Sequence, residues 1–268
     1  MKFYEGCTAL ITGASSGLGA EFARQLAPYA RCLVLVARRN DRLEELSSSL
    51  LAIHPTLQVR IYVADLASED RRTALAAWLD AEKIPVDFLI NNAGLGDHGS
   101  FDDSNWDRVK AMLDVNITAL THLTHLLVPR MLVAGRAAVL NVSSVASFFP
   151  LPNMAVYSAT KAYVTSFSEA IAMELRPKGI TVTALCPGPV PTEFFDIATR
   201  DGGEVSHFKA FPAFVVSPQE AVQAGLDAVA RDRARVIPGP LLAAAVAVAL
   251  VIPFFIVRQI LRSKADSL

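Results

Sequence analysis

Thr12-Gly13-Ala14-Ser15-Ser16-Gly17-Leu18-Gly19 is the stretch that decides the fold of this chain. It follows an apolar run, residues 7–12, and opens an amphipathic segment, residues 17–29, so it joins a buried strand to a helix. The first glycine of the stretch permits a tight turn, the second lets the backbone approach a ligand, and the third permits close packing of helix on strand. A helix N-terminus attracts a pyrophosphate. The stretch therefore predicts a dinucleotide site whose cofactor contacts include Gly13, Ser15, Ser16, Gly17, Leu18 and Gly19.

The rest of the chain repeats the alternation of strand and helix. Further strands are expected at residues 31–37, 57–64, 86–91, 137–143, 179–186 and 235–237, and further helices at 41–54, 68–82, 106–134, 154–176 and 218–232. The strands are apolar on both faces, as are strands buried in a parallel sheet. These units predict a single α/β domain of the Rossmann type, doubly wound, although periodicity leaves the strand order open. We expect this catalytic domain to span 1–240, with a substrate lid at about 190–217, followed by an apolar helical tail at 241–268.

Composition narrows the class of protein. The chain has 268 residues, 52% of them hydrophobic, which suits one domain with one sizeable core. A formal net charge of −1 gives no sign of the excess positive charge that nucleic-acid binding requires. Its 3 cysteines, an odd number without paired spacing, favour reduced thiols. The first strand is expected to begin near residue 7, which leaves no room for a signal peptide. The cytoplasm, or the cytoplasmic face of a membrane, is therefore the expected compartment.

Tyr157 and Lys161 lie four residues apart and therefore share one helix face. A phenol titrates near pH ~10 in water, and a neighbouring ammonium should lower that pKa. Ser144 lies 13 residues before the tyrosine. Ser143 could also supply a hydroxyl, but adjacent residues at a strand end point in opposite directions, and the spacing favours Ser144.

Together with the glycine-rich turn, these residues make the chain resemble the short-chain dehydrogenase/reductase family from about residue 7 to residue 239. The resemblance implies a seven-stranded parallel sheet and a catalytic tetrad of Asn116, Ser144, Tyr157 and Lys161. Ser144 would stabilise charge on the substrate oxygen, Tyr157 would transfer the proton, and Lys161 would also hold the nicotinamide ribose. Asn116, in the helix expected at 106–134, would support a water-mediated proton path to Lys161. From the residue alone, a helix-interior asparagine whose amide is satisfied by backbone groups is an equal alternative.

The end of the second strand indicates which cofactor is used. An acidic residue there would bind the ribose 2′-hydroxyl of NAD, but this chain has Arg38 and Arg39. A guanidinium can hold a 2′-phosphate with two hydrogen bonds, so NADP(H) is expected, with Arg38 as the main contact and Arg39 in support. The resemblance adds further cofactor contacts, from Asp65, Leu66, Asn92, Ala93, Gly94, Tyr157, Lys161, Pro187, Gly188, Val190 and Thr192.

Aromatic side chains suggest the nature of the substrate. Phe149 follows the catalytic serine, and Phe194 lies in the expected lid. With Ser144 they would contact a hydrophobic carbonyl or alcohol, although such aromatics also serve to pack a lid on its domain. His122 and His125 are three residues apart, but spacing places no third ligand, so no metal site is expected.

The tail is the one departure from an ordinary soluble fold. Residues 241–257 carry no charge, and Arg258, Arg262 and Lys264 follow them. A membrane span needs roughly 20 apolar residues, with a lower limit near ~17, and Pro253 interrupts this run. Three alternatives stay open: burial in a homodimer or homotetramer interface, insertion in the cytoplasmic surface of a membrane, or a span. The sequence resembles a DltE-like, NADP-preferring branch of the family, which often ends in such a tail after a Val-Ile-Pro-Gly segment, here residues 236–239.

The predicted function is therefore that of an NADP(H)-dependent oxidoreductase. It would interconvert a carbonyl and a secondary alcohol by hydride transfer, with Tyr157 as the acid/base group. One alternative is an NADP-sensing binding protein on the same fold. Another is a membrane-associated lipid or sterol reductase, which differs from the first interpretation mainly in the role of the tail.

Overall fold

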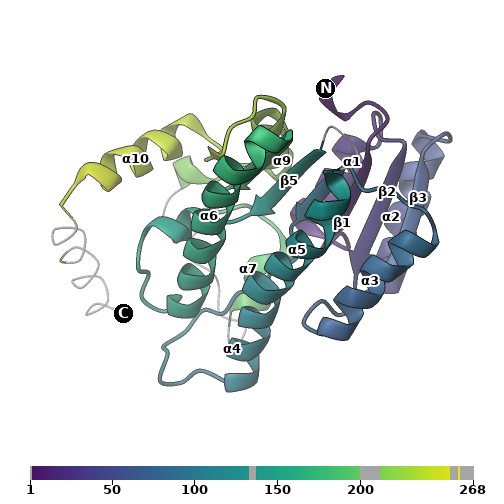
Figure 1. Ribbon diagram of the computed structural model, residues 1–268. Coiled ribbons are helices and arrows are strands. Elements are labelled where there is room, and N and C mark those ends of the chain that lie inside the picture. Colours follow the sequence, from purple (N-terminus) through teal and green to yellow (C-terminus); the bar gives the residue numbers. More distant parts are fainter. Residues whose placement is uncertain (1, 133–136, 200–211, 254–258, 260–268) are drawn as a thin grey trace.

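The computed structural model describes residues 2–132, 137–199, 212–253 and 259 (Figure 1). Seven parallel strands form one sheet in the order β3-β2-β1-β4-β5-β6-β7, which confirms the expected α/β fold and supplies the strand order that periodicity left open. The strands are β1 (Thr8–Thr12), β2 (Cys32–Ala37), β3 (Gln58–Val63), β4 (Phe88–Asn91), β5 (Ala137–Val142), β6 (Ile180–Leu185) and β7 (Arg235–Val236).

Helices cover both faces of the sheet (Figure 1). One face carries α1 (Gly17–Leu26), α2 (Asn40–Ile53) and α9 (Pro218–Ala230), and the other carries α3 (Glu69–Ala81), α5 (Leu120–Met131) and α6 (Ala155–Leu175). Strand β2 supplies both cores, because Leu33 and Leu35 point to the first face and Val34 and Val36 to the second. This explains the continuous apolar run of a central strand, since successive side chains of a strand alternate between the faces.

Strand β3 departs from the expectation that every strand is buried on both faces. It pairs with β2 alone and forms the edge of the sheet, and each of its residues is exposed or half-buried. Val63 at its end is 47% exposed. Gln58 and Arg60 interrupt the apolar run of β3, so its sequence carries the alternation of a strand with one face toward solvent, which the expectation overlooked.

The single helix expected at 106–134 is instead three elements. These are α4 (Trp106–Leu113), the π-helical segment η2 (Asp114–Ala119) and α5. A π segment inserts one residue per turn and often accompanies a functional site. The whole stretch, Trp106–Met131, is long and apolar enough to cross a membrane by length and composition, but Leu123 and Leu127 pack in the core against the sheet. It is therefore a core helix of the α/β fold.

The other expected helices and strands differ from the observed bounds by at most three residues. Short helices complete the fold: η1 (Lys2–Tyr4), η3 (Val145–Phe148), η4 (Arg176–Lys178), α7 (Glu193–Ala198), η6 (Pro212–Phe214) and α10 (Pro240–Val251). Of the expected lid, residues 200–211 lie outside the described part of the chain, as do residues 254–258 and 260–268 of the tail.

Candidate active site

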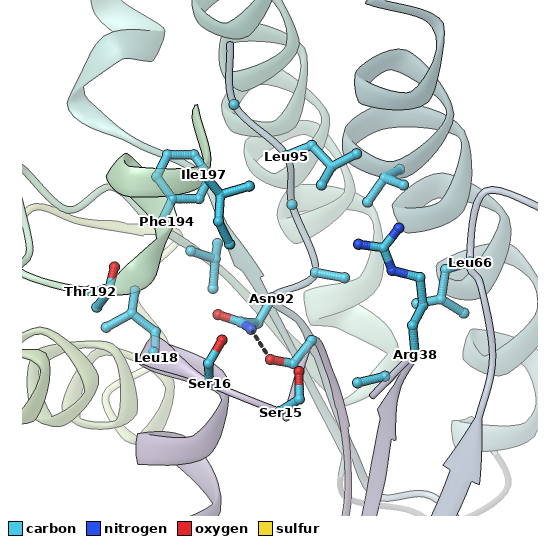
Figure 2. A pocket seen from close by; sticks show the side chains of 18 of the residues that line it. Ser15, Ser16, Leu18, Arg38, Leu66, Asn92, Leu95, Thr192, Phe194 and Ile197 are labelled. Atoms are coloured by element: carbon cyan, nitrogen blue, oxygen red, sulfur yellow. Dashed lines mark hydrogen bonds between the residues drawn. The ribbon is translucent and has the colours of Figure 1, made fainter. Parts of the chain in front are cut away.

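A cavity of about 370 Å³ opens at the carboxyl ends of the strands, between β1 and β4 (Figure 2). The strand order reverses at this point, and such a switch point is where open α/β sheets bind ligands. Most of the predicted cofactor residues line the cavity: Gly13, Ser15, Ser16, Gly17, Leu18, Arg38, Arg39, Asp65, Leu66, Asn92, Ala93, Gly94, Lys161, Pro187, Gly188, Val190 and Thr192. Gly19 and Tyr157, also predicted contacts, are not part of this lining.

The glycine-rich turn has the geometry that the sequence requires. Gly13 and Gly17 have φ angles of 65° and 53°, in the left-handed region that favours glycine. A Cβ atom on Gly19 would lie 2.2 Å from the carbonyl oxygen of Gly13. Gly19 therefore lets the first turn of α1 pack on the glycine-rich turn itself.

Thr12 and Asn92 hold this turn against the loop after β4. The hydroxyl of Thr12 accepts hydrogen bonds from the backbone N–H groups of Asn92 and Ala93, at 2.9 and 3.0 Å. The side-chain amide of Asn92 donates to the carbonyl oxygens of Thr12 and Gly13, at 2.9 and 3.2 Å. Asn92 thus braces the turn through its side chain. The role of Thr12 was missed from the sequence, where a threonine at a strand end has no distinctive signal.

The two arginines after β2 lie differently. Arg38 is exposed, and its side chain lies beside Leu66 (Figure 2). Arg39 bends back over the glycine-rich turn, where its Nη2 donates to Ser16 Oγ at 2.8 Å and to Ser15 Oγ at 3.3 Å. Its Nη1 forms an ion pair with Glu193 Oε2 at 3.1 Å. Glu193 opens α7, so this pair links the cofactor turn to the first helix of the expected lid.

The loop after β3 is held from inside the protein by Arg72. This side chain is only 2% exposed, and its Nη1 donates to the carbonyl oxygens of Leu66 and Ala67 at 2.6 and 3.0 Å. Its Nε donates to His122 Nδ1 at 3.0 Å. Asp65 caps the same loop by accepting from the N–H of Ala67 at 3.0 Å. Arg72 was missed because an arginine on a helix is usually solvated, and only the fold shows that this one is buried.

Ser144, Tyr157 and Lys161 come together, and Lys161 is the one of the three that lines the cavity. Ser144 is half-buried and shares a hydrogen bond with Tyr157. Ser143 points the other way, where its hydroxyl donates to the carbonyl oxygen of Lys161 at 2.9 Å and contacts Thr165 Oγ1 at 2.7 Å. The geometry therefore selects Ser144 as the hydroxyl that faces Tyr157.

The electrostatics of this cluster differ from the expectation. Burial raises the pKa of Tyr157 to about 12, and the hydrogen bond with Ser144 opposes this shift only in part. Burial also lowers the pKa of Lys161 to about 8. The expectation of a lowered pKa for Tyr157 is therefore wrong for this arrangement, because burial raises that pKa. Lys161 Nζ donates to the carbonyl oxygen of Val142 at 2.9 Å and lies 5.7 Å from the centroid of the Tyr157 ring, so desolvation dominates.

Asn116 lies in the π-helical segment η2 and is 2% exposed. Its Oδ1 accepts from the N–H of Leu95 at 2.8 Å, and its Nδ2 donates to the carbonyl oxygen of Leu95 and to Thr160 Oγ1, at 2.9 and 3.0 Å. These contacts match the structural alternative, in which the amide is satisfied by the protein and positions the loop after β4. A part in a proton path to Lys161 stays a prediction.

Apolar side chains surround Tyr157. Met112, Ala146 and Met154 pack with it in a small core, and Leu95, Leu151 and Phe194 cover that core. The ring of Phe194, from α7, lies 5.6 Å from the ring of Tyr157, centroid to centroid. Gly96 makes this approach possible, since a Cβ there would lie 2.8 Å from Phe194 Cζ.

Phe149 is placed less favourably than Phe194. It contacts Phe148 edge-on at 6.5 Å and does not line the cavity. Its predicted contact with the substrate stays a prediction.

The histidines are separate from this site. Nδ1 of His122 accepts from Arg72, and His125 is exposed. Within the described ranges, no group of three histidine, cysteine or acidic side chains could hold a metal ion. Cys7, Cys32 and Cys186 are all buried and free.

Residues 7–201 match the family described as short chain dehydrogenase. A sulfoacetaldehyde reductase of Chromohalobacter salexigens is 38% identical over 199 residues, covering 72% of this chain and 76% of that protein. The human very-long-chain 3-oxoacyl-CoA reductase is 32% identical over 193 residues, covering 70% of this chain and 61% of the relative.

Solved structures agree with these matches over nearly the whole chain. A short-chain dehydrogenase from Sphingobium yanoikuyae in complex with NADPH is 35% identical and superimposes with a TM-score of 0.78, covering 96% of this chain and 95% of that chain. A 3-ketoacyl-(acyl-carrier-protein) reductase from Brucella melitensis complexed with NADH is 26% identical, with a TM-score of 0.76 over 87% of this chain and 97% of that chain.

The chain therefore belongs to the short-chain dehydrogenase/reductase family. It is an oxidoreductase that interconverts a carbonyl and an alcohol with NAD(H) or NADP(H) as the cofactor.

Proposed function

We propose that this protein is an NADP(H)-dependent reductase of apolar aldehydes or ketones, with Tyr157 as the proton donor. The observation that carries the proposal is the buried cluster of Ser144, Tyr157 and Lys161 beside the cofactor cavity. When bound, the reduced nicotinamide supplies the hydride. The remaining task of the protein is to hold the carbonyl, stabilise negative charge on its oxygen and deliver one proton.

The protonation state of the cluster favours reduction. With a pKa of about 12, the Tyr157 hydroxyl keeps its proton throughout the neutral range and can give it to an alkoxide. The Ser144 hydroxyl, in hydrogen-bond contact with Tyr157, would donate to the same oxygen and stabilise its developing charge. Lys161, with a pKa of about 8, carries its charge at neutral pH and lines the cavity where a nicotinamide ribose would lie.

Two features support NADP(H) over NAD(H). No carboxylate occupies the two positions after β2; both are arginines that line the cavity. Arg38 is exposed and makes no hydrogen bond or ion pair with another described residue, so its guanidinium is available to a 2′-phosphate. Arg39 already lies over Ser15 and Ser16, which would let one group hold both the phosphate and the turn. The same two arginines support the prediction of the NADP-preferring, DltE-like branch of the family.

The substrate class follows from the wall around Tyr157. The described hydrophobic side chains that cluster with Tyr157 are those of methionine, alanine, leucine, valine and phenylalanine residues. These side chains favour an apolar group next to the carbonyl, because they offer a polar group no hydrogen-bond partner. A homodimer or homotetramer stays a prediction from the family resemblance, as do the domain bounds 1–240 and 241–268.

The proposal is tested by following oxidation of NADPH and of NADH with a panel of aldehydes and ketones of increasing apolar size. Tyr157→Phe removes the hydroxyl and keeps the ring. Tyr163→Phe is the matched control, because Tyr163 lies on the same helix, is 38% exposed and contacts Thr121 through its hydroxyl.

We expect turnover with NADPH that is lost in Tyr157→Phe and kept in Tyr163→Phe, while both variants bind NADPH. Normal turnover by Tyr157→Phe would refute the role of the phenol. Binding of NADPH with no turnover on any carbonyl would favour the NADP-sensing alternative.

A further inference from the structure

The helix α10 (Pro240–Val251) is apolar along its whole length and extends from one end of the molecule (Figure 1). Only two of its side chains, Leu242 and Val246, are buried. Four large apolar side chains are exposed: Leu241 at 57%, Val248 at 61%, Leu250 at 49% and Val251 at 81%. Exposed apolar side chains gathered on one helix indicate a surface that is covered in use.

The exposed residues occupy a broad arc. At about 100° per residue, positions 241, 244, 247, 248, 250 and 251 spread over roughly half of the circumference, opposite Leu242 and Val246. None of these positions carries a polar side chain. A helix–helix contact needs a narrower stripe, whereas a lipid phase accepts an apolar arc of any width.

The chain that follows α10 carries positive charge. Arg258, Arg262 and Lys264 come after the apolar run, against one acidic residue, Asp266. Two copies of this chain that packed their tails side by side in parallel would bring like charges together. An anionic lipid surface would instead attract them.

The length and end of α10 favour a helix that lies in the membrane surface over one that crosses it. Its 12 residues span about 18 Å, whereas the hydrocarbon core of a bilayer is about 30 Å thick. The helix ends at Val251, and Ile252 is extended, with φ −71° and ψ 132°. Pro253 explains this end, because the residue before a proline avoids the helical region.

We propose that the exposed arc of α10, formed by Leu241, Val248, Leu250 and Val251, inserts into the surface of an anionic lipid bilayer. The basic residues that follow it would meet the lipid headgroups. This interaction does not depend on the proposed reductase activity, because none of the four side chains lines the cofactor cavity.

The inner face of α10 attaches this surface to the catalytic domain. Leu242 packs on the backbone of Gly188, where a Cβ would lie 2.5 Å from Leu242 Cδ2. Gly188 belongs to the loop that lines the cavity, and α10 also contacts η3, which follows Ser144, and η6. A bilayer that holds α10 would therefore hold the active site at a defined distance from the lipid.

The test is co-flotation of the purified full chain with vesicles of phosphatidylcholine containing about 30 mol% phosphatidylglycerol. The variant Val248→Asp/Val251→Asp places two charges in the exposed arc. Ile53→Asp is the matched control, because Ile53 is 72% exposed but ends α2, on the body of the protein. Thermal unfolding and NADPH binding of each variant verify that the fold is kept, since all three positions are at the surface.

We expect the native chain and Ile53→Asp to float with the vesicles. The double variant should lose at least about tenfold in its partition coefficient, because an aspartate at the membrane is strongly disfavoured. Replacing Arg258, Arg262 and Lys264 by glutamine should weaken binding to the anionic vesicles and leave any binding to pure phosphatidylcholine unchanged.

Absence of flotation by the native chain would overturn the proposal, and so would equal flotation of the double variant. If the double variant instead changed the sedimentation coefficient of the protein without lipid and left flotation unchanged, a second copy of the chain would be the partner. Loss of turnover in the reductase assay has no bearing on these outcomes, so the two proposals fail separately.

Discussion

Replacing Glu193 by glutamine should strengthen the binding of NADPH and leave the binding of NADH unchanged. Arg39 contacts two groups: its Nη1 forms an ion pair with Glu193 at 3.1 Å, and its Nη2 donates a hydrogen bond to Ser16 Oγ in the glycine-rich turn. A 2′-phosphate at the end of β2 would compete with the carboxylate for the same guanidinium. The carboxylate would also repel the phosphate.

The size of the expected change in NADPH affinity follows from the solvent exposure of the ion pair between Arg39 and Glu193. The side chains of Arg39 and Glu193 are 41% and 45% exposed, so water screens their attraction, and such pairs contribute about 0.2–1 kcal/mol. Removing the competitor therefore gains at most about 1 kcal/mol for NADPH, or roughly a fivefold lower Kd. NADH has no 2′-phosphate and gains nothing.

The assay is calorimetric titration of Glu193→Gln with each cofactor at two salt concentrations. Asp196→Asn is the matched control, because it removes one negative charge from the same helix α7. We expect the Kd ratio of NADH to NADPH to rise in Glu193→Gln alone, and the gain to shrink at high salt. An equal change for both cofactors, or a weaker NADPH complex, would refute the reasoning.

Three further predictions concern the interior of the site. Affinity for NADPH should be greatest below about pH 8 and should fall as the pH rises through the Lys161 pKa of about 8, because the ammonium group then loses its charge. Fluorescence titration measures this affinity, and a constant Kd across this pH range would contradict the prediction. Gly19→Ala should weaken NADPH binding at least about tenfold and destabilise the fold by about 1–3 kcal/mol, because the new Cβ would lie 2.2 Å from a backbone oxygen. Calorimetry measures the binding and urea unfolding the stability, and native affinity for NADPH would count against the argument. Arg72→Met should lower the free energy of unfolding by roughly 3 kcal/mol, because it leaves the carbonyl oxygens of Leu66 and Ala67 without their donor. If urea unfolding showed a decrease under about 1 kcal/mol, water would have replaced the guanidinium.

Local rules explain why much of the site could be predicted. The glycine-rich turn depends on φ angles and close contacts within one short segment, so the spacing of its glycines is enough to predict it. The four-residue spacing of Tyr157 and Lys161 sets a shared helix face in any fold. The apolar strands identify a buried parallel sheet, and the family resemblance supplied the number of strands.

Properties set by distant neighbours could not be predicted. The pKa of Tyr157 depends on burial by residues from α4, α7 and the loop after β4, and this burial outweighs the lysine one turn away. The partner of Arg39 comes from α7, 154 positions along the chain. The break in the helix at η2 accompanies contacts between Asn116 and the backbone of Leu95, which no periodicity shows.

The sequence by itself determined the class of this protein, because the cofactor turn, the catalytic pair and each apolar segment are patterns of residues close together in the chain. Only the tertiary structure decided which of the two serines faces the phenol, which arginine is tied to a carboxylate, and that burial keeps the phenol protonated. It also decided that α10 turns Leu242 and Val246 inward and leaves the rest of its apolar surface exposed. The physical reason is that pKa values, ion pairs and exposure depend on the groups nearby in space, and in this fold those groups come from strands and helices far apart in the chain.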